Sequence, residues 1–262
     1  MDDENKLITE RKKKLEAIRK NFAAYPNSFR KKDNSSDLIK NYNDIEKSEL
    51  EKRAIKVTVA GRLLTIRGMG NSTFANLHDE FGKIQIYLQK KEIGDESYNL
   101  LNHLDLGDIV GIEGVLFKTK TGELTINTNS IVFLAKSLRP LPEKFHGIAD
   151  IEIKYRQRYL DLMINEETKT LFKTRAKIIS SIRNFFIADN YLEVETPMMH
   201  MIPGGASAKP FITHHNSLDM ELYLRIAPEL FLKRCIIGGL EKVFEINRSF
   251  RNEGLSVKHN PE

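Results

Sequence analysis

Alternating hydrophobic and polar residues run from Lys56 to about Thr128 and predict a series of short strands. Gly-containing turns separate most of these runs, and a polar stretch long enough for a helix, Lys90–Leu104, follows the third. The predicted strands are Val57–Leu64, Ser72–Leu77, Lys83–Leu88, Asp108–Phe117 and Glu123–Thr128. Five strands with a helix between the third and the fourth follow the order of an OB-fold barrel.

A helical period, with hydrophobic residues three or four positions apart, precedes the barrel. It predicts a helix over residues 4–20, with a hydrophobic stripe that begins at Leu7 and many Lys and Arg residues around it. A second, short helix is predicted after Ser35-Ser36, because Ser favours a helix start.

The same period returns after the barrel and predicts a long helix from about Glu167 to Ala188. Two hydrophobic stripes lie side by side on it, which is more surface than one core contact needs. We therefore expect this helix also to pack against a partner chain. Asn190 tolerates the left-handed conformation of a C-cap and is expected to end the helix.

Short strands dominate the last seventy residues. Tyr191–Pro197 and Leu222–Ile226 alternate, and a helix is predicted to begin at Ala227-Pro228-Glu229, where Pro and an acidic residue suit the first turn. Val243–Phe250 predicts a final strand with one buried face. It continues to Arg251 and Glu253, which are two residues apart and so point to the same side.

These changes of pattern divide the chain into four parts and give an α+β fold class. Residues 1–55 form an N-terminal helical extension, and residues 56–142 form the barrel, which a Pro-marked segment closes. Residues 143–166 are an inter-domain linker, and residues 167–262 begin a second domain.

Composition is typical of a soluble globular protein of 262 residues, with 40% hydrophobic and 29% charged residues. The net charge of +5 favours an anionic partner. The single cysteine, Cys235, excludes a disulfide framework, fits a reducing cytoplasm and is expected to be buried. The sequence has no signal peptide and no hydrophobic run that could span a membrane. His214-His215 lacks a third ligand at metal-site spacing, so no metal site is predicted within the chain.

Two constellations carry candidate chemistry. Arg251 beside Glu253, followed by a loop with Lys258 and His259, suits a nucleoside triphosphate, although a surface ion pair would give the same spacing. In the barrel, Phe74 and Tyr87 could stack on the bases of single-stranded nucleic acid, or they could simply fill the core.

The segments Phe250-Arg-Asn-Glu253 and His259-Asn-Pro-Glu262 resemble motif 2 of class II aminoacyl-tRNA synthetases. The resemblance covers the whole chain and is greatest for the lysine branch. It implies that Arg251 is catalytic and bridges the lysine carboxylate and the α-phosphate of ATP. Glu253 would contact the adenine amino group, and His259 and Asn260 would line the ATP site.

The resemblance also implies lysine-binding residues before motif 2. The loop Ile202–Phe211 would lie over the amino acid, with Gly205 near its α-ammonium group, and Glu229 would bind an ammonium group of lysine. Mg²⁺ would assist the reaction. Its ligands in the family lie mostly beyond residue 262, because the chain stops inside the motif 2 loop and before motif 3.

Two further parts of the chain resemble known elements of class IIb synthetases, the enzymes for Asp, Asn and Lys. The barrel pattern implies that Phe74 stacks on the central anticodon base of tRNA(Lys), that Gln85 reads that base, and that Arg67 and Tyr87 lie beside it. The long helix and the following strand resemble motif 1, which forms a homodimer interface. The residues implied there are Leu171, Ile178, Phe185 and Pro197.

The sequence thus predicts the N-terminal half of a lysine-activating, tRNA-charging enzyme of the cytoplasm. A non-catalytic RNA-binding fragment remains an alternative, as does a sister enzyme for Asp or Asn. Glu229 and the phrases Arg139–Gly147 and Lys209–Asn216 resemble the lysine branch and favour it over the sister enzymes.

Overall fold

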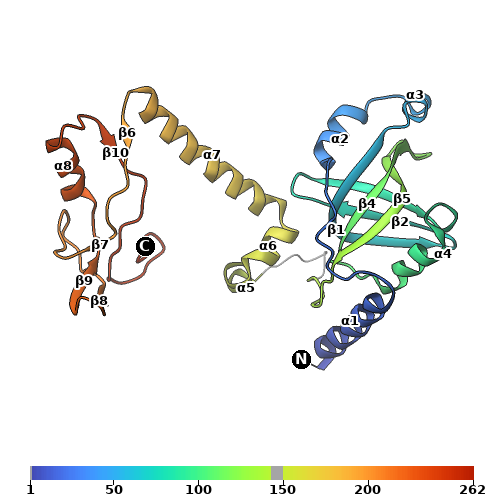
Figure 1. The fold of residues 1–262 in the computed structure, drawn as a ribbon, viewed down its shortest axis with the longest axis horizontal. Helices are drawn as coiled ribbons and strands as arrows, with labels where there is room; N and C mark the ends of the chain where they lie inside the picture. The colour runs from blue at the N-terminus through green and yellow to red at the C-terminus, as the bar shows by residue number, and fades with distance from the viewer. Residues whose placement is uncertain (1, 143–149) are drawn as a thin grey trace. The chain divides into compact units, whose positions relative to one another are not determined.

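The computed structural model describes residues 2–142 and 150–262. The chain forms two units, Met1–Arg156 and Gln157–Glu262 (Figure 1). The first residues of the predicted linker, 143–149, lie outside the described residues.

Within the described part of unit 1, five strands close a barrel in the order β1-β2-β3-β5-β4. Neighbouring strands are antiparallel except for β3 and β5, which are parallel. Helix α4 (Lys90–Leu100) and the 3-10 turn η1 (Leu101–His103) connect β3 to β4. The strands are β1 (Lys56–Met69), β2 (Ser72–His78), β3 (Lys83–Gln89), β4 (Ile109–Lys118) and β5 (Leu124–Ala135). The predicted OB-fold order is confirmed.

Alternation along the strands builds the barrel interior. In β2 and β3 every second residue is buried, and fully buried side chains from the strands include Leu77, Ile86 and Ile126. At Gly61 a Cβ atom would lie 2.4 Å from the carbonyl oxygen of His78, so only glycine allows the close strand approach that closes the barrel.

Helix α1 (Asp2–Asn21) joins this core through Leu15 and Ile18, which are buried. Leu7, expected on the same stripe, is 45% exposed. The N-terminal part of α1 extends away from the barrel, as Figure 1 shows, so the first turns have no core to join. Unit 1 also contains α2 (Ser35–Tyr42), α3 (Lys47–Arg53) and α5 (Ile151–Arg156).

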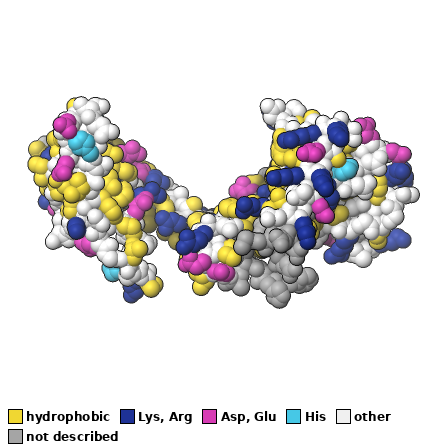
Figure 2. Space-filling model, turned by 90° about the horizontal axis from the view of Figure 1, so that it is seen from below, with side chains coloured by type: hydrophobic (Ala, Val, Ile, Leu, Met, Phe, Trp, Pro, Cys, Tyr) yellow, Lys and Arg dark blue, Asp and Glu magenta, His cyan; other side chains and the backbone are white. Residues whose placement is uncertain are grey.

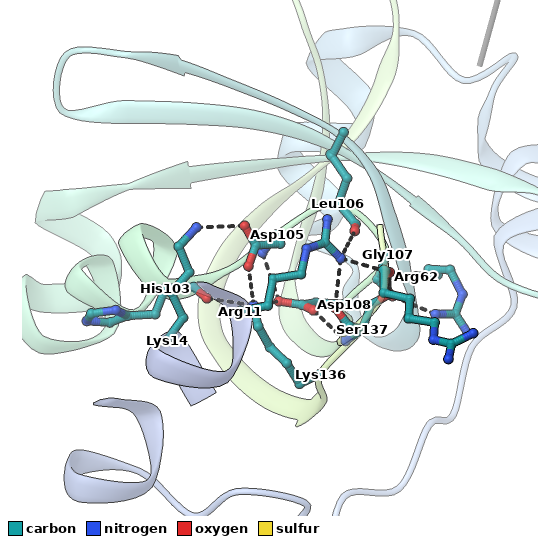
Figure 3. Close-up of polar contacts among 11 residues, drawn as sticks. Arg11, Lys14, Arg62, His103, Asp105, Leu106, Gly107, Asp108, Lys136 and Ser137 are labelled. Carbon is teal, nitrogen blue, oxygen red and sulfur yellow. Dashed lines mark hydrogen bonds and ion pairs between the residues drawn. The ribbon is translucent and has the colours of Figure 1, made fainter. Parts of the chain in front are cut away.

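A buried ion cluster lies at the end of β5 (Figure 3). The ammonium group of Lys136, whose side chain is fully buried, lies 2.6 Å from Asp105 and 2.7 Å from Asp108. It also donates to the carbonyl oxygen of His103 at 2.8 Å, so its three protons have three acceptors. Lys14 of α1 pairs with the same Asp105 at 2.6 Å, which ties the helix to the barrel.

Unit 2 begins with α6 (Arg158–Ile164) and α7 (Glu166–Ala188), and α7 is the predicted long helix. Asn190 has φ of +61°, which confirms the predicted left-handed residue after the helix. Strands β7 (Met199–His200), β8 (Ile212–His215) and β9 (Met220–Leu224) form an antiparallel sheet in the order β7-β9-β8. Helix α8 (Glu229–Ile237) follows, and β6 (Leu192–Glu193) pairs in parallel with β10 (Val243–Phe244).

Two predicted strands are much shorter than expected. Tyr191–Pro197 keeps only the two residues of β6, and Val243–Phe250 keeps only the two residues of β10. The physical reason for the second lies in its hydrogen bonds. The amides of Phe250, Arg251 and Asn252 donate to Arg225, Pro261 and Lys209, three separate segments, rather than to one neighbouring strand. Arg251 and Glu253 therefore do not share the face of a strand.

Burial in unit 2 is sparse. Among its described hydrophobic residues only Ile226 and Phe244 are buried, and Cys235, expected to be buried, is partly exposed. Figure 2 shows hydrophobic side chains gathered on the surface of this unit. Within the described residues, no helix is both long enough and hydrophobic enough to cross a membrane.

Candidate functional sites

An aromatic pair lies on the outer face of the barrel. Phe74 of β2 and Tyr87 of β3 are register partners, and their rings stack with centroids 4.4 Å apart and an interplanar angle of 26°. Both are half-buried, whereas their neighbours Ala75 and Ile86 point inward and are buried. The alternative that these aromatic residues fill the barrel core is therefore wrong.

A hollow of about 550 Å³ opens beside this pair, and all four predicted anticodon residues line it. Arg67 is exposed at the end of β1, and Gln85 is half-buried on β3. The amide of Gln85 is oriented at both ends: its nitrogen donates to Glu123 at 2.9 Å, and its oxygen accepts from the hydroxyl of Thr125 at 2.9 Å.

Sequence reasoning missed several residues of this hollow. Phe117 lies 6.0 Å from Tyr87 between ring centroids. The last residue of β4 and the loop that follows it contribute two cations and Glu123. The cations are Lys118 and Lys120. The turn at Gly122, with these charges around it, was visible in the sequence, but their distance from Gln85 depends on the parallel pairing of β3 with β5. Stacking rings, an amide edge and nearby cations suit a base and its phosphate.

In unit 2 the loop Ile202–Phe211, called the glycine loop below, lies against the start of α8. Gly205 has φ of +88°, and a Cβ atom there would lie 3.1 Å from Cβ of Glu229 and 3.2 Å from Cβ of Ala227. The structure therefore brings together two residues that were predicted for one ligand. Glu229 is the first residue of α8, its side chain is 49% exposed, and its carboxylate lies 2.6 Å from Lys233.

The same loop also contacts the segment that carries Arg251 and Glu253. The amide of Lys209 donates to the carboxylate of Glu253 at 3.3 Å, and the amide of Asn252 donates to the carbonyl of Lys209 at 2.8 Å. Arg251 is exposed, and no ion-pair partner for its guanidinium is found in residues 2–142 and 150–262. The alternative of a surface ion pair between Arg251 and Glu253 is not what the structure shows.

The end of the chain folds back on itself. Nδ1 of His259 lies 2.7 Å from the hydroxyl of Ser256, and the backbones of these two residues form a β-bridge. Asn260 is exposed. Both therefore lie on the exposed loop that follows Arg251, where a ligand can reach them.

A buried ion pair that the sequence analysis missed lies next to the segment that carries Arg251. Arg225 and Glu245 approach to 2.7 Å with both side chains 1% exposed. Burial works to raise the pKa of Glu245, but hydrogen bonds from Arg225, Thr196 and Asn247 outweigh it and hold that pKa below its usual value. No sequence signal marks the pair, since each residue alone reads as an ordinary surface charge.

The predicted interface residues are all exposed. Leu171 and Phe185 on α7 are 66% and 70% exposed, Ile178 lies on the same helix, and Pro197 follows β6. His214 pairs with Asp219 at 3.3 Å. Within the described ranges, no three His, Cys, Asp or Glu side chains gather as they would around a metal ion.

Comparison with known proteins matches both units. Residues 150–262 match part of the class II tRNA synthetase family (D, K and N), and residues 57–134 match the OB-fold nucleic acid binding domain.

The similarity extends over nearly the whole chain to one kind of enzyme in this family. The chain is 57% identical to the lysine–tRNA ligase of Neisseria gonorrhoeae over 99% of this chain and 52% of that protein. It is 58% identical to the lysine–tRNA ligase of Neisseria meningitidis serogroup A and 55% identical to that of Methylobacillus flagellatus, again over 99% of this chain. The chain spans about half the length of these curated relatives.

Proposed function

We propose that this chain belongs to a lysine–tRNA ligase, with tRNA anticodon binding in unit 1 and lysine activation in unit 2. The observation that carries the proposal is the glycine loop of unit 2. It contacts Glu229 through Gly205 and the Arg251–Glu253 segment through Lys209, so the residues proposed for lysine and for ATP lie around one loop.

In the first step the lysine carboxylate attacks the α-phosphate of ATP, and pyrophosphate leaves. Glu229 binds an ammonium group of lysine, Arg251 bridges the carboxylate and the α-phosphate, and Glu253 contacts the adenine amino group. No side chain acts as a nucleophile, because positioning and charge neutralisation supply the rate acceleration. A hydroxyl of the tRNA's terminal adenosine then attacks the lysyl carbonyl carbon, and AMP leaves.

Mg²⁺ would balance phosphate charge in such a reaction. The described residues do not assemble a carboxylate set that fits it, so the proposal assigns it no ligand here and no step through it. The exposed hydrophobic face of α7 supports a homodimer, with Leu171, Ile178 and Phe185 at the interface. Charging of tRNA serves translation, which places the proposed activity in the cytoplasm.

The four predicted anticodon residues, all of which line the barrel hollow, define the RNA half of the proposal. The stacked pair Phe74–Tyr87 would receive the central anticodon base, and Gln85, oriented by Glu123 and Thr125, would contact its edge. Arg67 would contact the backbone or a neighbouring base. The domain bounds expected from the sequence, 56–142 for the anticodon domain and 167–262 for the catalytic part, belong to the same proposal.

The test is ATP–pyrophosphate exchange by the full-length protein with lysine, aspartate or asparagine as the only amino acid. We expect exchange with lysine alone. Exchange with aspartate or asparagine instead would favour a sister enzyme. RNA binding without exchange for any of the three would favour a non-catalytic RNA-binding protein.

A further inference from the structure

Arg225 is the largest fully buried side chain of unit 2 among the described residues. Its guanidinium donates to the carboxylate of Glu245 at 2.7 Å and to the hydroxyl of Thr196 at 2.9 Å, with a longer contact to the Thr196 carbonyl at 3.3 Å. Its Nε donates to the carbonyl oxygen of Arg248 at 2.7 Å. One side chain therefore connects three separate segments.

Glu245 completes the cluster from the other side. It accepts from the amide of Thr196 at 3.2 Å, from the hydroxyl of Thr196 at 2.7 Å and from the side chain of Asn247 at 3.1 Å. The charged group is fully hydrogen-bonded, as a buried carboxylate must be.

The backbone of Arg225 adds two further ties. Its amide donates to the carbonyl of Met198 at 2.8 Å, and its carbonyl accepts from the amide of Phe250 at 2.8 Å. Phe250 directly precedes Arg251, and Met198 directly follows Pro197. Glu229 lies four residues after Arg225, at the start of α8. The cluster thus joins the segments that carry the proposed ATP residue, the proposed lysine residue and the proposed interface proline.

Stability alone does not require an ion pair at this place. Desolvating two charges costs several kcal/mol, and a hydrophobic pair of similar volume often stabilises as well or better. A hydrophobic pair cannot supply the directed bonds to Thr196 and to the Arg248 carbonyl. Those bonds hold the irregular segment after β10, which has few other backbone partners, in one conformation.

We infer that Arg225, through its ion pair with Glu245, is a positioning residue for Arg251. The inference rests on the proposed function, since it assigns Arg251 its role in amino-acid activation. Arg225 itself is buried and does not touch a substrate.

The test replaces the ion pair by hydrophobic residues, with the double variant Arg225→Met/Glu245→Leu, and compares it with Arg225→Lys and the control Lys169→Met. Lys169 pairs with Glu166 on α7, away from the cluster. Each full-length variant is assayed for ATP–pyrophosphate exchange, thermal unfolding, and hydrogen exchange of the peptide that contains Phe250 and Arg251.

For the double variant we expect a melting temperature within about 5 °C of wild type, a kcat at least tenfold lower, and KM values for lysine and ATP within threefold. Hydrogen exchange at Phe250 and Arg251 should be at least tenfold faster. Arg225→Lys, which keeps the charge but not the forked donor, should retain more kcat than the double variant, and Lys169→Met should behave as wild type.

A double variant with wild-type kcat and wild-type hydrogen exchange would overturn the inference and leave the pair a structural feature. If the double variant does not fold, Arg225→Lys alone decides, since unchanged kcat and hydrogen exchange there would also overturn it. If wild type activates none of the three amino acids, the proposed function fails, and hydrogen exchange still decides whether Arg225 holds the Arg251 segment.

Discussion

The two units of the chain bury different kinds of side chain. Unit 1 closes a barrel on itself, and its largest buried residues, such as Phe133, Ile86 and Leu88, are hydrophobic. In unit 2 the largest buried residue is Arg225, a cation, while Leu171 and Phe185 remain exposed. A closed barrel supplies its own core, whereas the short strands and the long helix of unit 2 leave hydrophobic faces exposed.

This difference predicts how well each proposed function should tolerate substitutions. The proposed RNA hollow rests on register partners in a closed barrel. The proposed activation site rests on a loop and an irregular segment, held by one buried ion pair and a few backbone bonds. We expect changes in unit 2 to abolish chemistry and leave RNA binding intact. The four predictions below test that separation, from the largest expected effect to the smallest.

The largest effect should come from Lys136→Ala in unit 1. Removing the ammonium group leaves the carboxylate of Asp108, whose side chain is fully buried, without its counter-charge. Breaking a buried ion pair on one side costs about 3–5 kcal/mol. Hydrogen exchange of barrel peptides in increasing urea measures the loss, and peptides of unit 2 should exchange as in wild type.

The control for this variant is Lys52→Ala, because Lys52 is exposed on α3. It should change the barrel's stability by less than about 0.5 kcal/mol. A loss below about 1 kcal/mol for Lys136→Ala would mean that the stability of the barrel does not depend on this buried ion cluster. The hydrophobic core alone would then stabilise unit 1, and the contrast with unit 2, where a buried ion pair holds the segments together, would be stronger than we argue.

Arg251→Ala should abolish amino-acid activation in unit 2 without changing RNA binding by unit 1. A charged contact made mainly to the transition state contributes about 3 kcal/mol, so ATP–pyrophosphate exchange should fall roughly a hundredfold or more. Binding of an anticodon stem-loop should stay within twofold of wild type. Arg183→Ala, which removes an α7 arginine paired with Glu193, is the control. A loss of exchange below tenfold would remove Arg251 from the reaction.

The barrel was predictable because each strand carries its own signal. Alternation fixed five strands, Gly turns separated them, and the helix before the fourth strand gave the topology. The same alternation placed Gln85 and Tyr87 on one face, but it could not say whether that face is inside or outside. The register of Phe74 opposite Tyr87, with Ala75 and Ile86 turned inward, decides that.

Unit 2 was harder to predict because its structure depends on contacts between distant segments. The long helix and the left-handed Asn190 follow from local periodicity and backbone preference, and both were predicted. The strand predicted through Phe250 was wrong beyond Phe244, because a strand exists only where a neighbour pairs with it. Arg225 and Glu245 lie twenty residues apart, and only the fold shows that they form one buried pair.

A pH effect of about 2 kcal/mol should appear in unit 1 at Asp79. Its carboxylate accepts from the amide and hydroxyl of Ser35 at 2.9 Å and 2.6 Å, and it pairs with Lys31 at 2.8 Å. Burial works to raise the pKa of Asp79, but these hydrogen bonds outweigh it and lower the pKa to about 2. The folded protein therefore binds a proton less readily than the unfolded chain.

The direction of the pH effect follows from the difference between the pKa of Asp79 in the folded protein and in the unfolded chain. Asp79 stabilises the fold fully above the pKa of the unfolded carboxyl, near 3.8, and the contribution disappears as the pH falls through about 2. Wild type should be about 2 kcal/mol more stable than Asp79→Asn at pH 6, and the gap should close between pH 4 and pH 2. A gap that does not change with pH would show that Asp79 acts only through its shape and neutral hydrogen bonds.

The smallest effect, and the finest test of the barrel hollow, separates Phe74 from Gln85. Stacking on an aromatic ring contributes about 1–3 kcal/mol per base. Because Tyr87 remains beside the base, Phe74→Ala should cost about 1–2 kcal/mol for any central base. Gln85→Ala keeps the stack and removes an edge contact, so it should reduce discrimination at the central base by about 1 kcal/mol and hardly weaken binding to mismatched loops.

Titration of a stem-loop with a central U, and of its central-C variant, at one fixed salt concentration measures both effects in the full chain. Phe81→Ala is the control, because Phe81 is 48% exposed in the turn between β2 and β3 and does not line the hollow. The two variants should have different effects. Phe74→Ala should lower the affinities for the central-U and the central-C stem-loops by the same factor, whereas Gln85→Ala should reduce the difference between these two affinities. If both variants bind each RNA as wild type does, the aromatic pair is only a surface feature of the barrel. RNA recognition would then have to lie elsewhere on unit 1, and the functional division between the two units would lose its RNA half.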